Sequence, residues 1–414
     1  MFSRLLMVVA ALALLAGACS DADADLVVGA VYPTSGGQGM GGRDELRGVR
    51  LAAELVNARG GVRGRGIVIR LRPASAAEAA SQAVDALARA GVPVILGSHG
   101  STISARAAAA ATRKRLLFWE TGAVGNLGDD AAGGGYVFRF APTGASLGRA
   151  AVSFVHQRLQ PLLPRQGTLR YAVAYVDDAY GRSVGGGAVD QLRDAGLTLA
   201  GTFPYRLEGA DYGQLARRIG DVRPDVLVVA AYLEDGVALR RAILLAGVPL
   251  VASIGTSSSY CMPEFGAALG DQAVGLFASD KPDGEVIDPG RLAPEGAWAL
   301  RWASGEYRRR HREPMRAEAL SGFAGGWALF RHVLPRARDL SPESVARAAL
   351  RLRLPMGSLP NGAGLELAPQ GASDAGANRR AAQVIWEWVA PLDRAVVWPP
   401  SWATAPIAPI DIEP

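Results

Sequence analysis

The first hydrophobic run of the chain is followed by a helical stripe and then by a second hydrophobic run. Residues 26–31 are six apolar or small residues between turn formers, which predicts a strand buried on both faces. After a glycine-rich loop, apolar residues recur at helical spacing, as expected for a helix lying on a sheet: Val49, Ala52, Ala53 and Val56. Residues 67–71 supply the next strand. The loop at 35–42 is long and polar, and we expect it to touch a ligand.

The alternation of strands and helices continues along most of the chain. Strands are expected at 92–96, 116–119, 136–140, 171–176, 197–203, 225–231 and 249–254, with helices between them. This alternation predicts an α/β fold, with parallel sheets, helices on both faces and ligands at the carboxyl ends of the strands. Later segments are mostly helical (293–311, 315–334, 342–350), with strand candidates at 274–278 and 383–389.

The N-terminal residues have the features of an export signal. Arg4 is followed by an apolar stretch of about eleven residues, which is too short to span a bilayer because spanning takes about 20. The small residues before Cys19 resemble a bacterial lipobox, in which Cys19 becomes the diacylated first residue. An ordinary cleaved signal with an incidental cysteine is the alternative. We therefore expect a lipoprotein signal peptide at 1–18 and a solvated tether at 19–25.

Composition limits the class of protein. If Cys19 carries lipid, Cys261 is left alone and no intrachain disulfide can form. With 414 residues, of which 49% are hydrophobic, the chain can build two lobes with their own cores. The net charge of +5 comes almost entirely from arginine and forms no basic stripe with aromatics, so no nucleic-acid partner is expected. The densest cluster, 308–312, ends a helix, where it is either solvated or in contact with lipid headgroups.

Several short motifs occur in a suggestive order. They are Val28-Gly29-Ala30, Ser35-Gly36, the stretch Leu55 to Gly64, the stretch Leu96 to Thr102, the stretch Asp177 to Gly181, Ala230-Ala231-Tyr232, and Gly376-Ala377-Asn378. Together, over roughly residues 26–390, they resemble the type I periplasmic binding proteins of the leucine/isoleucine/valine-binding group of ABC transporters.

The resemblance implies a fold and its division. It implies two Rossmann-like lobes with parallel sheets, joined by a three-crossover hinge and closing on a ligand. Carried over to this chain, lobe 1 spans about 26–141 plus 277–365, and lobe 2 spans about 142–276 plus 366–395. Residues 396–414 are rich in proline and are expected to form an irregular tail.

The resemblance also implies which residues bind the ligand in lobe 1. Ser101 and Thr102 match hydroxyls that hold an amino acid's carboxylate, and a helix N-terminus there would favour an anion. A simple helix cap is the alternative role for them. Thr121, Gly122 and Ala123 match a loop that binds the ligand's backbone. Glu120 stands where serine is commoner, and is either an extra ligand acceptor or a contact between lobes.

In lobe 2 the resemblance points to Tyr180 and Tyr232, aromatics that cover the ligand. A tyrosine face beside an ammonium gains about 0.5–2 kcal/mol, although both residues would also serve as core fillers. Ser257 stands where the family often has a carboxylate for the α-ammonium. Glu120, Glu234 or Asp235 would replace that carboxylate, or the ligand is not a plain α-amino acid.

Enzyme motifs are present only in incomplete form. Residues 37–42 fit G-x-G-x-x-G, but they lie away from the strand end, and Arg72 stands where a ribose-binding acid would be needed. Two G-x-S-x-G matches, at 144–148 and 181–185, do not directly follow a strand. The histidines and Cys261 show no metal-ligand spacing. We therefore expect no catalytic residues, no metal and no cofactor.

These observations lead to an expected function. The chain is expected to be an extracytoplasmic, lipid-anchored substrate-binding protein of an ABC importer, at the periplasm or cell surface. Its partners would be a membrane permease and an amino acid or amino-acid-like small polar solute, bound by hinge closure. The alternative is a sensing module that signals to a partner without delivering cargo. Neighbouring permease and ATPase genes would favour import, and a neighbouring sensor kinase or receptor would favour sensing.

Overall fold

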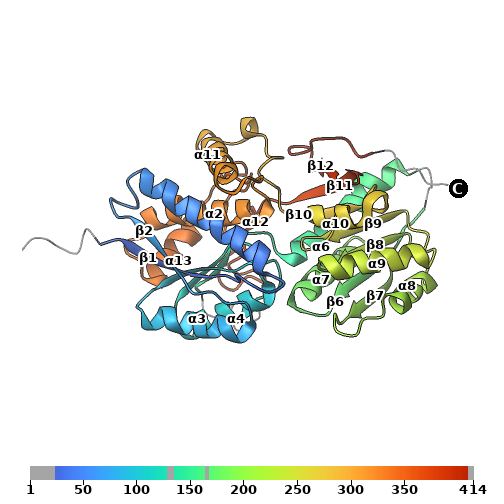
Figure 1. Cartoon of the computed structure of the whole chain (residues 1–414), viewed down its shortest axis with the longest axis horizontal. Helices are drawn as coiled ribbons and strands as arrows, with labels where there is room; N and C mark the ends of the chain where they lie inside the picture. Colours follow the sequence, from blue (N-terminus) through green and yellow to red (C-terminus); the bar gives the residue numbers. More distant parts are fainter. Residues whose placement is uncertain (1–23, 128–134, 164–166, 409–414) are drawn as a thin grey trace, which may run out of the picture.

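The chain folds into two α/β lobes that lie side by side (Figure 1). The computed structural model describes residues 24–127, 135–163 and 167–408. The expected signal peptide and Cys19 lie outside the described residues. Among the residues that are described, no helix is both long and apolar enough to cross a membrane.

The first lobe is built on a parallel sheet whose strand order is β2-β1-β3-β4-β5. Its strands are β1 (Leu26–Val31), β2 (Ile67–Leu71), β3 (Val94–Gly97), β4 (Leu117–Glu120) and β5 (Val137–Arg139). Its helices are α2 (Gly39–Ala58), α3 (Ala77–Arg89), α4 (Ser101–Arg113), α11 (Pro294–His311), α12 (Ala317–Trp327) and α13 (Pro342–Arg351). Helix α12 continues as a π-helical segment, Ala328–Val333.

Both faces of this sheet are buried along its inner strands β1, β3 and β4, whose residues are almost all apolar or small. Val31, Ile95 and Phe118 join one hydrophobic cluster with residues of α3 and α4. Ala30 and Trp119 join another with residues of α2 and α12. This two-sided burial is what the continuous apolar runs predict, and it leaves the carboxyl ends of the strands for polar loops.

The second lobe contains a larger sheet with strand order β12-β11-β10-β9-β8-β6-β7. Its strands are β6 (Arg170–Val176), β7 (Thr198–Tyr205), β8 (Val226–Ala230), β9 (Ala252–Thr256), β10 (Phe277–Asp280), β11 (Val384–Ala390) and β12 (Asp393–Trp398). β11 pairs antiparallel with both β10 and β12, and the other pairings are parallel. Its helices are α6 (Gly144–Phe154), α7 (Ala179–Asp194), α8 (Tyr212–Asp221), α9 (Leu233–Leu245) and α10 (Pro263–Leu269).

Along the described residues the chain passes between the lobes three times. It crosses from β5 to α6, from β10 to α11, and from a segment beside β5 to β11. The three-crossover hinge expected from the resemblance is therefore present.

The crossovers shift several expected boundaries. Residues 277–280 pair with β9, so they belong to the second sheet rather than to lobe 1. Residues 366–378, expected in lobe 2, lie beside lobe 1, because Ala377 bridges to Arg139 at the end of β5. Residues 393–398 form β12, so the expected tail at 396–414 begins within a strand. The resemblance placed these boundaries only approximately, because they depend on which sheet each strand joins.

Candidate functional site

A cavity of about 610 Å³ lies between the two lobes and takes its walls from both. The loop after β1 contributes Gly37 and Gln38, and the first turn of α2 contributes Met40 and Gly41. His99 also lines the cavity. Helix α9 of the second lobe contributes Leu233, Glu234 and Asp235 from its first turn. The expectation that the loop at 35–42 touches a ligand site agrees with this placement, because the loop lies at the carboxyl end of a central strand.

The second-lobe wall is organised around Tyr232, which lines the cavity. Its hydroxyl donates a hydrogen bond to Asp178 Oδ2 at 2.6 Å. Asp178 caps α7, because its Oδ1 accepts the N–H groups of Tyr180 and Gly181. The Tyr180 ring lies 5.3 Å from that of Tyr232, and its buried hydroxyl is 2.9 Å from Thr256 Oγ1. Tyr180 therefore supports Tyr232 from behind.

Two acidic residues, Glu234 and Asp235, lie in the first turn of α9 at the cavity wall. The Tyr205 hydroxyl donates to Asp235, whose side chain is buried. Burial raises the pKa of Asp235 to about 6, and the hydrogen bond from Tyr205 opposes that rise. Glu234 and Asp235 are two of the residues proposed from the sequence to replace the missing acid at Ser257, and both line the cavity.

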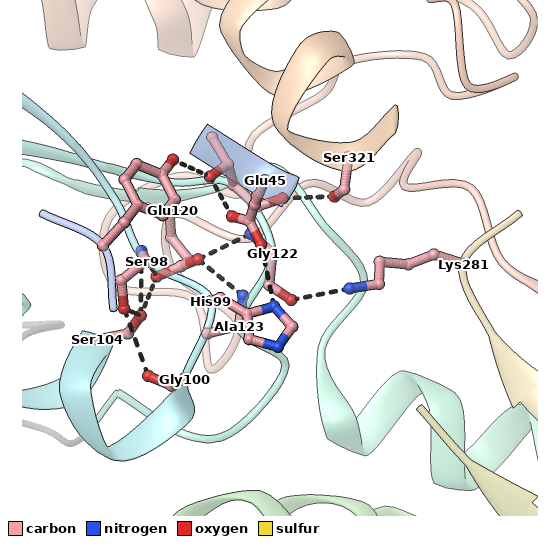
Figure 2. A network of polar contacts seen from close by, with 12 residues as sticks. Glu45, Ser98, His99, Gly100, Ser104, Glu120, Gly122, Ala123, Lys281 and Ser321 are labelled. Carbon is pink, nitrogen blue, oxygen red and sulfur yellow. Dashed lines mark hydrogen bonds and ion pairs between the residues drawn. The ribbon is translucent and has the colours of Figure 1, made fainter. Parts of the chain in front are cut away.

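Glu120 has a different place. Its carboxylate points back into the first lobe and accepts the backbone N–H groups of Ser98 at 2.9 Å, Gly122 at 2.8 Å and Ala123 at 2.7 Å (Figure 2). The Ser104 hydroxyl also donates to it. Glu120 does not line the cavity. It is therefore neither the extra ligand acceptor nor the contact between lobes that the sequence left open.

A second buried carboxylate, Glu45 of α2, lies close to Glu120 (Figure 2). The Thr121 hydroxyl donates to Glu45 and is 2.6 Å from the Tyr32 hydroxyl. His99 Nδ1 lies 3.3 Å from Glu45 Oε2, so the network ends at a residue of the cavity wall. Burial, with a further contribution from Glu45, raises the pKa of Glu120 to about 8. Glu120 therefore retains its proton near neutral pH.

Charged residues also lie at the hinge between the lobes. Asp280, at the end of β10, is buried and lines the cavity, and its Oδ2 accepts from the Cys261 thiol at 2.8 Å. Burial raises the pKa of Asp280, although neighbouring Lys281 lowers it. Burial alone would lower the pKa of Lys281, but Asp280, Glu318 and Glu45 raise it. Lys281 is therefore a buried cation, and its ammonium donates to Gly122 O at 3.2 Å (Figure 2).

The residues expected to bind the ligand are not all brought together. Of the eight, Tyr232 lines the cavity, and the other seven lie outside its lining. Ser101 Oγ accepts the N–H of Gly125 at 3.0 Å, whereas Thr102 is exposed. The N–H groups of Gly122 and Ala123 are bonded to Glu120. The remaining three expected residues, Thr121, Tyr180 and Ser257, are buried.

Some wall residues had no signal in the sequence. The cavity wall also includes Asp280, Asp283, Glu318 and Arg394, which come from segments far apart along the chain. Only the crossovers bring those segments together, so no spacing pattern marks them. Within the described part of the chain, no group of three or more histidine, cysteine, aspartate or glutamate side chains could hold a metal ion.

The sequence and the fold can be compared with those of known proteins. Residues 25–365 match the family described as periplasmic binding protein. The chain belongs to the periplasmic binding protein family. It is 27% identical to Leu/Ile/Val-binding protein homolog 8 of Brucella suis biovar 1 over 373 residues, which are 88% of each protein.

Solved structures share the fold of this periplasmic binding protein. The leucine-binding protein LivK from Thermotoga maritima superposes with a TM-score of 0.72 at 17% identity, covering 90% of this chain and 97% of that one. A solute-binding protein from R. palustris, in complex with benzoate, gives a TM-score of 0.68 at 14% identity, covering 90% and 95%. Both comparisons show the two-lobed fold expected from the sequence.

Family membership settles two of the expectations. Members are solute-binding proteins rather than enzymes, so the incomplete dinucleotide and hydrolase motifs need another explanation. The family also implies an extracytoplasmic location. The cleft between the lobes is therefore the candidate solute site.

Proposed function

We propose that this periplasmic binding protein is the substrate-binding component of an ABC importer and binds one small polar solute between its lobes. The cavity supports this most directly, because its walls come from both lobes and from the hinge strands. A solute that contacts both walls stabilises the closed arrangement, and that difference in binding free energy drives closure. A membrane permease would then recognise the closed form.

Relatives and structural neighbours support this function in general terms. The Brucella relative is named for leucine, isoleucine and valine binding, and the R. palustris neighbour holds benzoate. The same fold therefore accepts solutes of different chemistry. An amino acid or an amino-acid-like solute is the class we propose for this chain.

Thermal unfolding tests the proposal. A solute present at 100 times its dissociation constant adds about 2.7 kcal/mol to the free energy of unfolding. We expect the purified protein to unfold at a higher temperature with at least one member of a panel of amino acids, amides, amines and small organic acids. If every member of the panel leaves the unfolding temperature unchanged, the proposed function is wrong.

We also propose that Cys19 carries the lipid anchor. The lipobox-like sequence before it supports this, and Cys19 itself lies outside the described residues. Replacing Cys19 by alanine should move the protein from the membrane fraction to the soluble fraction, or leave its signal peptide unprocessed. An unchanged, processed membrane fraction in Cys19→Ala would contradict the anchor.

A further inference from the structure

The cavity between the lobes is acidic. Among the described residues that line it, eight carry a carboxylate and two carry a guanidinium. Both guanidinium groups are already paired, Arg316 with Glu264 at 3.0 Å and Arg394 with Asp283 at 2.6 Å. Six carboxylates remain: Asp44, Asp178, Glu234, Asp235, Asp280 and Glu318.

Cations behind the wall offset only part of this charge. Arg47 lies 2.7 Å from Asp44. Lys281 is buried beside Asp280 and Glu318 and stabilises their charges, but it does not line the cavity. Two basic side chains, Arg47 and Lys281, thus offset six carboxylates. The excess of negative charge is concentrated on the second-lobe wall. Facing carboxylates repel one another, so a positive charge between them would be held favourably.

The side chain of Asp280 independently supports the binding of a hydrogen-bond donor in the cavity. It is 1% exposed and lines the cavity, yet its Oδ1 has no hydrogen-bond partner. A buried oxygen without a donor costs about 1–3 kcal/mol, and more for a charged group. An N–H donor arriving in the cavity would remove that cost. A positively charged donor would also meet the charge of the carboxylate.

The first lobe offers little to a negatively charged group. The N–H groups of Gly122 and Ala123, whose loop the resemblance expects to bind the ligand's backbone, are occupied by Glu120. The Ser101 hydroxyl is bonded to the N–H of Gly125. The polar groups that the resemblance expects to bind an amino acid in the first lobe are therefore already bonded within the protein, to the Glu120 carboxyl group and to the backbone of Gly125.

Aromatic rings complete a cation-binding wall. Tyr212 and Tyr232 both line the cavity, and the hydroxyl of Tyr232 is fixed by Asp178. Ring faces attract ammonium and guanidinium groups. We propose that the cleft selects a small organic cation, bearing an ammonium or guanidinium group, and that this solute needs no α-carboxylate. This inference rests on the proposed solute-binding function.

Matched pairs of solutes test it by calorimetry or thermal unfolding. Lysine and norleucine differ in the side-chain ammonium, and agmatine and arginine differ in the α-carboxylate. We expect lysine to bind at least ten-fold more tightly than norleucine, and agmatine at least as tightly as arginine. The affinity of each cation should fall as salt is raised, because salt screens the wall charges.

Substitutions of acidic residues in the cavity wall test where the cation binds. Asp280→Asn should weaken agmatine binding at least ten-fold. Because Asp280 is buried beside Lys281, that variant could fail to fold. Glu234→Gln therefore provides a second test, since Glu234 is exposed in the first turn of α9, and it should weaken binding several-fold. Glu78→Gln, an exposed acid on α3, removes the same charge far from the cavity and should leave the affinity unchanged.

The outcomes separate the two proposals. Tighter binding of leucine, norleucine or benzoate than of lysine and agmatine would overturn the cation preference while supporting solute binding. Equal loss of agmatine affinity in Glu78→Gln and Glu234→Gln would also overturn it, because the effect would then be one of net charge. If no solute of any class binds, both proposals fail together.

Discussion

Glu120 changes the chemistry of the first lobe because its carboxyl group accepts three backbone N–H groups, two of which belong to Gly122 and Ala123, which were expected to bind the ligand. It lies beside a second buried acid, Glu45, and a negative charge on Glu45 raises the free energy of ionising Glu120. Burial and Glu45 raise the pKa of Glu120 to about 8, from an ordinary value of 4.5. Its proton is therefore bound by the folded protein at pH values where the unfolded chain has released it.

This difference predicts a pH dependence of stability. Between pH 4.5 and about 8 the folded state binds more protons than the unfolded state, so the free energy of unfolding should fall as pH rises. One such proton contributes at most about 1.4 kcal/mol per pH unit. Glu120→Gln has no proton to lose there, so its stability should fall less steeply between pH 5 and 8.5 in urea unfolding. Parallel curves for the two proteins would contradict the raised pKa.

A substitution of Ser101 can decide whether this residue contacts the ligand or serves a structural role. Its hydroxyl accepts the N–H of Gly125, and both residues are buried. Ser101→Ala should therefore cost about 1–3 kcal/mol of unfolding free energy, because that N–H loses its acceptor. Solute affinity should stay within two-fold. Thr102→Ala, on the neighbouring exposed side chain, should change stability by no more than about 0.5 kcal/mol. Unchanged stability with a ten-fold affinity loss in Ser101→Ala would instead establish the ligand role.

At the scale of elements, close helix crossings hold each lobe together. Helices α2 and α12 approach so closely that a Cβ on Gly48 would lie 2.0 Å from Ala319 O and 2.6 Å from Phe323 N. In the second lobe, a Cβ on Gly148 of α6 would lie 2.1 Å from Val184 O of α7. The two G-x-S-x-G matches lie on α6 and α7, so this crossing explains a glycine of one of them without any catalytic role.

The crossing of α2 and α12 can be tested by substitution. Gly48→Ala should destabilise the protein by about 1–3 kcal/mol, since the backbone atoms it meets cannot move aside as a flexible side chain could. Gly186→Ala is a matched control, because it is also helical but has no heavy atom within 4 Å of its Cβ position. The control should gain about 0.5–1 kcal/mol from the higher helix propensity of alanine. Equal unfolding midpoints for the two variants would contradict the close crossing.

The elements themselves were largely predictable from the sequence. The apolar runs at 116–119 and 225–231 form strands at 117–120 and 226–230, because parallel strands buried on both faces must be apolar throughout. β12 was missed because the prolines that follow it suggested a tail. The site was predicted less well. Tyr232 and Glu234 follow a strand end that the sequence marks, whereas Asp280 and Glu318 reach the cavity only through the crossovers.

At the scale of the whole molecule, the two lobes present like charges to each other across the cleft. Asp44 and Glu318 line it from the first lobe, and Asp178, Glu234 and Asp235 line it from the second. Without a cation between them, these walls repel and favour separation of the lobes. A bound cation would remove the repulsion and also contact both walls, so charge neutralisation and closure would be coupled.

This coupling predicts that salt alone changes the shape of the unliganded protein. Charges are screened over about 30 Å at 0.01 M salt but over only about 3 Å at 1 M, so the walls should repel strongly only at low salt. The radius of gyration from small-angle X-ray scattering should therefore shrink as salt is raised, and at low salt it should shrink on adding agmatine. Asp44→Asn combined with Glu234→Gln removes one charge from each wall and should reduce the response to salt. A salt-independent radius, or an unchanged response in that variant, would show that wall repulsion does not hold the lobes apart.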